Sequence, residues 1–152
     1  MNKEKFTNLS WEEINKELIS ACSEGNIEKI DYLLNSKELK RNPDLNYKDG
    51  EPILAACFKN HVKVIKYILT APELDKKFDV HSDQDALFIS LCVLKKHDIL
   101  KYLIEEFNIE ETQDIKQYLR KSNDSLVSNM FLNRTLKSDL PNLTHKEKRI
   151  KI

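Results

Sequence analysis

Thiol and imidazole side chains are among the groups in this chain that could bind a metal ion or act as nucleophile and base. The three cysteines, Cys22, Cys57 and Cys92, are 35 residues apart. They form no C-x-x-C motif and no two histidines are spaced i, i+4, so the spacing predicts no metal site. His61 and His97 have no nucleophile partner in the sequence, and a catalytic triad has no support.

Carboxylates gather in two segments that could bind a cation. Residues 44–50 begin like a calcium loop, but Lys48 stands where a third oxygen ligand is needed and Ala55 where the closing carboxylate should be, which excludes calcium there. Residues 79–85 hold three aspartates and His81, which could bind a cation or change the proton affinity of an acid. Aspartate and serine are also the residues that an exposed turn selects, and we favour the turn.

The chain has two glycines and none of the glycine-rich phosphate-binding or nucleophile motifs, so nucleotide chemistry is not expected. With no catalytic constellation either, we predict that the protein is not an enzyme, binds no cofactor and has no small-molecule substrate.

Composition fits one small domain of 152 residues, 40% of them hydrophobic. No run approaches the ~18 apolar residues of a membrane span, and the start lacks a signal peptide's apolar region. We therefore expect a cytoplasmic protein with reduced thiols and no membrane contact. The first 115 residues carry a net charge of −6 and the rest +6, which we interpret as a solvated surface rather than an electrostatic binding site.

The cysteines belong to a longer repeat that must position them. Three tyrosines, Tyr32, Tyr67 and Tyr102, have the same spacing of 35. The sequence L-I-S-A-C recurs as I-L-A-A-C and F-I-S-L-C, and I-D-Y-L-L recurs as I-K-Y-I-L and L-K-Y-L-I. A constant period of this size indicates stacked structural repeats, which would place each thiol in the core of its own layer.

Each repeat is predicted to be a pair of helices joined by a turn. Ser10 and Glu13 form a capping box, which predicts a helix from about Trp11 to Glu24. Gly25 ends this helix, and a second one follows. Its apolar face contains Ile27, Ile30, Leu33 and Leu34.

These residues resemble ankyrin repeats, whose pattern is roughly T-P-L-H-x-A-A-x-x-G-H-x-x-I-V-x-x-L-L. The second repeat matches best, with P-I-L-A-A-C-F-K-N-H at 52–61 and V-I-K-Y-I-L at 64–69. Glu51 replaces the family's threonine and Leu54 its histidine. The resemblance covers about residues 16–111 and implies an all-α solenoid. The 35-residue period is similar to that of bacterial and phage-encoded ankyrin proteins.

Three repeats are expected at about 16–50, 51–85 and 86–115, between an N-terminal helical cap and a degenerate C-terminal helical cap at 116–141. Residues 1–141 would form a single domain, and 142–152 a flexible basic tail. Lys95 takes the turn position that Gly25 holds in the first repeat. Either that turn is strained or the helix end is remodelled.

The resemblance also implies a binding surface. Partners of ankyrin proteins usually contact the exposed side of each first helix and the tips of the hairpin-like loops between repeats, which are called fingers. The helix positions that carry over are Phe58, Lys59, Val93 and Leu94, and the finger positions are Tyr47, Lys48, Asp83 and Gln84. Phe58, Val93 and Leu94 would lie side by side as an apolar patch on the concave face. The competing interpretation is that the C-terminal cap covers them, and we leave both open.

We therefore expect a protein–protein interaction module that binds a partner protein through its concave face and finger loops. If the likeness to bacterial and phage repeats holds, the natural partner class is a host protein that the module sequesters or inhibits. The alternative is association with nucleic acid through the basic C-terminal region, which salt would weaken strongly.

Overall fold

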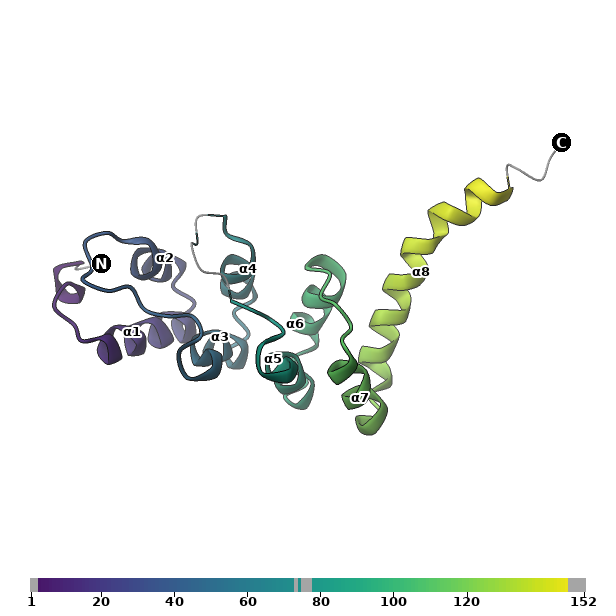
Figure 1. The fold of residues 1–152 in the computed structure, drawn as a ribbon, viewed down its shortest axis with the longest axis horizontal. Helices are drawn as coiled ribbons and strands as arrows, with labels where there is room; N and C mark the ends of the chain where they lie inside the picture. Colours follow the sequence, from purple (N-terminus) through teal and green to yellow (C-terminus); the bar gives the residue numbers. More distant parts are fainter. Residues whose placement is uncertain (1–2, 73, 75–77, 148–152) are drawn as a thin grey trace. The chain divides into compact units, whose positions relative to one another are not determined.

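The computed structural model describes residues 3–72, 74 and 78–147, with the backbone alone for residues 3, 82 and 139–147. All regular secondary structure in these ranges is helical (Figure 1). The all-α class predicted from the repeat is therefore confirmed. The chain divides into two compact units, Met1–Leu87 and Phe88–Ile152, each described by itself below.

Helix α1 (Trp11–Glu24) begins and ends where the sequence predicts. The Ser10 hydroxyl accepts the N–H of Glu13 at 3.3 Å, and the Glu13 carboxylate accepts the N–H of Ser10 at 2.8 Å. This capping box satisfies backbone donors that have no partner inside the helix. At the other end Gly25 takes φ +74°, and the N–H of Asn26 donates to the carbonyl of Ala21, five residues back, at 3.0 Å.

The first helices of the other two repeats end in the same way. Helix α3 (Tyr47–Phe58) is followed by Asn60 at φ 59°, and α5 (Ser82–Val93) by Lys95 at φ 53°. In each case the next N–H bonds to the carbonyl five residues back, at 2.9 and 3.0 Å. The third repeat therefore keeps the left-handed turn, although its residue is not glycine.

The second helices are α2 (Ile27–Asn35), α4 (Val62–Thr70) and α6 (His97–Lys101), and α6 continues as one π-helical turn, η2 (Tyr102–Glu106). A short 3-10 helix, η1 (Lys3–Phe6), precedes α1. Each second helix buries an aliphatic face, as the predicted spacing requires. The fully buried side chains include Leu18, Ile30, Leu33, Ile53, Ile65, Ile68, Ile99, Leu100 and Leu103.

Each finger ends in a turn of left-handed residues that leads directly into the next first helix. The φ angles are 48°, 57° and 81° at Lys48, Asp49 and Gly50, and 49°, 55° and 61° at Asp83, Gln84 and Asp85. Right-handed helix resumes after Gly50 and Asp85, at the predicted starts of the second and third repeats.

In the second unit, α7 (Gln113–Ser122) and α8 (Ser125–Glu147) follow the third repeat where a helical cap is expected. The Phe131 ring packs 5.8 Å from that of Phe88, and Arg134 donates to the carbonyls of Ile104 and Ile109 at 3.3 and 2.6 Å. Helix α8 continues past residue 141 through the first part of the expected tail. The last five residues lie outside the described range, so the flexible tail stays a prediction.

Candidate functional site

The apolar residues singled out by the sequence are exposed at the ends of their helices. Phe58 is the last residue of α3 in the first unit and is 57% exposed. Val93, the last residue of α5, is 65% exposed in the second unit, and Leu94 beside it is 36% exposed. Lys59 follows Phe58 as an exposed C-cap residue.

The α7–α8 turn borders Val93 without covering it. A hollow of about 510 Å³ is lined by residues from the end of α5, from α7 and from the turn after it, among them Val93, Lys95, Tyr118, Asp124 and Leu126. Val93 keeps most of its surface open to solvent beside this hollow. Burial under the C-terminal cap therefore does not occur within the second unit.

The finger residues divide into exposed and buried groups. Lys48, Asp83 and Gln84 are exposed at the left-handed tips. Tyr47 is 9% exposed, which corrects its predicted place at an open rim. Its ring meets the Trp11 ring edge-on, with centroids 5.2 Å apart, because its position at the start of α3 turns it toward α1.

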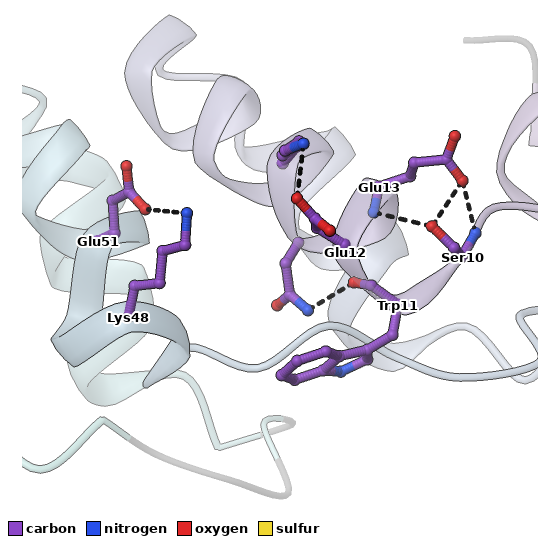
Figure 2. A network of polar contacts seen from close by, with 8 residues as sticks. Ser10, Trp11, Glu12, Glu13, Lys48 and Glu51 are labelled. Atoms are coloured by element: carbon purple, nitrogen blue, oxygen red, sulfur yellow. Dashed lines mark hydrogen bonds and ion pairs between the residues drawn. The ribbon is translucent and has the colours of Figure 1, made fainter.

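Sequence reasoning missed Trp11, which is 39% exposed and presents the open aromatic surface next to this finger (Figure 2). Arg41 lies over the indole, with its guanidinium carbon 4.9 Å from the ring centroid. The available signal was a large aromatic residue directly after the N-cap Ser10, where a polar residue is the usual choice.

The two carboxylate-rich segments act as turns. Asp44 accepts the N–H of Asn46 at 3.0 Å, and Asp79, 35 residues later, accepts the N–H of His81 at 2.9 Å. Asp85 is buried, and its Oδ1 lies 2.5 Å from Nδ1 of His81. No group of three or more His, Cys, Asp or Glu side chains with metal-binding geometry occurs among the described residues.

The three cysteines are buried thiols without disulfide bonds. Burial raises the pKa of Cys22 and of Cys92 to about 12 in each case, because an apolar interior disfavours the thiolate. A thiol that stays protonated at neutral pH is a poor nucleophile and a poor metal ligand. The repeated cysteine position therefore serves packing.

The basic side chains of the expected tail give no geometry for a nucleic-acid site, since the side chains of residues 139–152 lie outside those described. In the part of the chain that the structure covers, no helix has the length and apolarity to cross a membrane.

Comparison with known proteins agrees with the helical repeats just described. No curated protein and no solved structure matches the chain significantly. A family model described as ankyrin repeats (3 copies) matches residues 18–117, about two-thirds of the chain. That range runs from α1 through the three predicted repeats into α7. The chain belongs to the ankyrin repeat family.

Proposed function

We propose that the protein is a binding module whose partner contacts the ends of the first helices and the finger tips. Ankyrin repeats are generally protein–protein interaction modules and non-enzymatic scaffolds. The observation that carries the proposal is the exposure of Phe58 and Val93, which hold the same position in consecutive repeats. Large apolar side chains exposed at a repeated position favour a role in binding over a role in packing.

Polar residues are exposed at the other positions that we propose for partner contact. Lys48, Lys59, Asp83 and Gln84 are exposed polar residues at the finger tips and at the end of α3. A polar rim around apolar anchors is the usual arrangement of a protein interface. The helices that carry the anchors are already folded, so binding would order little additional backbone.

The partner that we propose is a host protein, which the module would sequester or inhibit. This step is supported by the 35-residue period alone. We place the module in the cytoplasm, where buried cysteines without disulfide bonds suit a reducing compartment.

The test is capture of partners from lysate of the native cell by the immobilised chain, followed by mass spectrometry. We expect Phe58→Asp combined with Val93→Asp to lower capture of the main partner about tenfold or more, because charged groups would enter the interface centre. Leu132→Asp combined with Leu136→Asp is the matched control, since both leucines are 55% exposed but lie on α8. This control variant should capture as much of the main partner as the wild-type chain does.

Circular dichroism and the melting temperature must match wild type in all variants. Equal capture by the Phe58/Val93 variant and wild type would reject the proposed surface. Loss of all capture after nuclease treatment or in high salt would instead favour the nucleic-acid alternative, with Lys148→Ala and Arg149→Ala as its test.

A further inference from the structure

Trp11 presents an exposed indole that neighbouring side chains hold in place. It is the first residue of α1, and Figure 2 shows its ring standing out from the helix. Tyr47 meets it edge-on at an interplanar angle of 84°, and the Arg41 guanidinium covers part of the ring. Tryptophan, tyrosine and arginine are the residue types that dominate binding energy in protein interfaces. Here all three form one cluster in the first unit.

The segment that carries Arg41 is fixed to the end of α2. The Asn42 side-chain amide donates to the carbonyls of Leu33, Leu34 and Ser36 at 3.0, 3.1 and 3.1 Å. Stacking on Trp11 then restrains the Arg41 side chain itself. A partner group that binds this guanidinium would therefore immobilise little further side-chain freedom.

Arg41 retains its capacity to bind an anion. Two other cations of this unit are already paired with carboxylates. Nζ of Lys16 lies 2.8 Å from Oε1 of Glu12, and Nζ of Lys48 lies 4.0 Å from Oε2 of Glu51. Arg41 is exposed and makes no ion pair with any residue that the structure describes. Its planar guanidinium offers paired N–H donors that match the two oxygens of a carboxylate.

A hollow of about 390 Å³ adjoins Arg41, lined also by Leu34, Asn35, Asn42, Pro43, Asp44, Leu45 and Leu74. The Asp44 carboxylate in this hollow already accepts the N–H of Asn46. The lining is therefore mixed: Arg41 is its one cation, and leucine side chains alternate with polar ones.

We infer that Trp11 and Arg41 form a binding site for an aspartate or glutamate side chain of a protein partner. Arg41 holds the carboxylate, and the indole packs against the peptide beside it. One guanidinium without an ion pair to any described residue matches a single carboxylate rather than a polyanion such as nucleic acid. The inference rests on the proposed protein-binding function but uses none of its apolar anchors.

Selection of a random dodecapeptide library against the whole chain tests this site. The enriched peptides should share an acidic residue, and Arg41→Gln should weaken their binding about tenfold or more. Arg41→Lys should give an intermediate loss, because lysine keeps the charge but lacks the planar pair of donors. Lys63→Gln is the matched control, since Lys63 is an exposed cation on α4 of the same unit. It should bind as wild type does.

Trp11 is the only tryptophan in the chain, so its fluorescence reports on the site directly. An enriched peptide should change that fluorescence, and the same peptide with amides in place of its carboxylates should not.

Peptides without an acidic residue, or peptides that bind Arg41→Gln as tightly as wild type, overturn the inference. If Phe58→Asp abolishes their binding instead, the proposed function stands. A single-stranded oligonucleotide that changes the fluorescence with the same Arg41 dependence, or a library without binders, also overturns the inference.

Discussion

At the scale of single residues, the repeat position determines the chemistry of the cysteines. Cys22 and Cys92 are equivalent in sequence, and burial raises the pKa of each to about 12. Because the thiolate is the reactive form, native labelling by an aromatic disulfide reagent at pH 8 should be slow at Cys22, Cys57 and Cys92. Labelling in denaturant should be fast at all three. Rapid native labelling of all three thiols would show that they do not lie in the core.

Lys95 is the residue at which the third repeat departs most clearly from the first. Its φ of 53° is left-handed, a region that costs a residue with a Cβ about 1–2 kcal/mol relative to glycine. Lys95→Gly should therefore raise the free energy of unfolding by about 1 kcal/mol, measured by urea denaturation. Lys101→Gly, within α6, should lower it by about 1 kcal/mol. A loss of stability in Lys95→Gly would contradict the left-handed turn.

Individual residues were predictable where a single position decides the conformation, as at Gly25. They were not predictable where several neighbours act together. Asp83, Gln84 and Asp85 form a left-handed turn without any glycine, held in part by the contact of the buried Asp85 with His81. Neither this contact nor the stacking of Arg41 on Trp11 follows from residue types and spacing.

At the scale of helices, neighbouring repeats are joined at their turns. His61, before α4, donates from Nε2 to the carbonyl of Ser23 near the end of α1 at 2.9 Å. The same imidazole packs on Gly25, where an added Cβ would lie 2.9 Å from Nδ1. The glycine therefore serves both the left-handed turn and the close approach of the next repeat.

Gly25→Ala should lower the free energy of unfolding by about 2 kcal/mol or more, because it adds a steric clash to the left-handed penalty. In a His61→Ala background, Gly25→Ala should lower the free energy of unfolding by about 1 kcal/mol less, because the new Cβ no longer meets an imidazole. A double-mutant cycle by urea denaturation measures this difference. Strictly additive costs would mean that the imidazole does not pack on Gly25.

The boundaries of helices were predictable wherever caps are encoded locally. Ser10, Glu13 and Gly25 fix both ends of α1 through bonds within a few residues. The π-helical turn η2 that continues α6 was not foreseen. Phe107 donates to the carbonyl of Tyr102, five residues back, and Ile109 to that of Leu103, six residues back, so the helix accommodates an extra residue before Asn108 turns left-handed. Nothing local in the sequence marks that insertion.

At the scale of the whole molecule, the repeated motif and its constant period were together sufficient to predict the family, because each repeat contributes the same buried positions. The surface that we propose for partner binding follows less directly, since it depends on which exposed residues differ between repeats. Phe58 and Val93 were predicted from the register, whereas Trp11 lies before the first repeat and has no equivalent that could single it out. A repeat pattern therefore predicts the scaffold better than the residues it presents.

The end of a repeat array needs a cap, and the second unit tests this directly. Phe131 on α8 is buried against Phe88 of the third repeat and has Arg134 over its ring at 5.0 Å, whereas Leu132 beside it is exposed. Phe131→Ala should therefore lower the free energy of unfolding by about 3–5 kcal/mol, because it removes a large side chain from a packed core. Leu132→Ala, in the same helix, should change it by less than about 0.5 kcal/mol. Equal costs in urea denaturation would show that α8 does not cap the third repeat through Phe131.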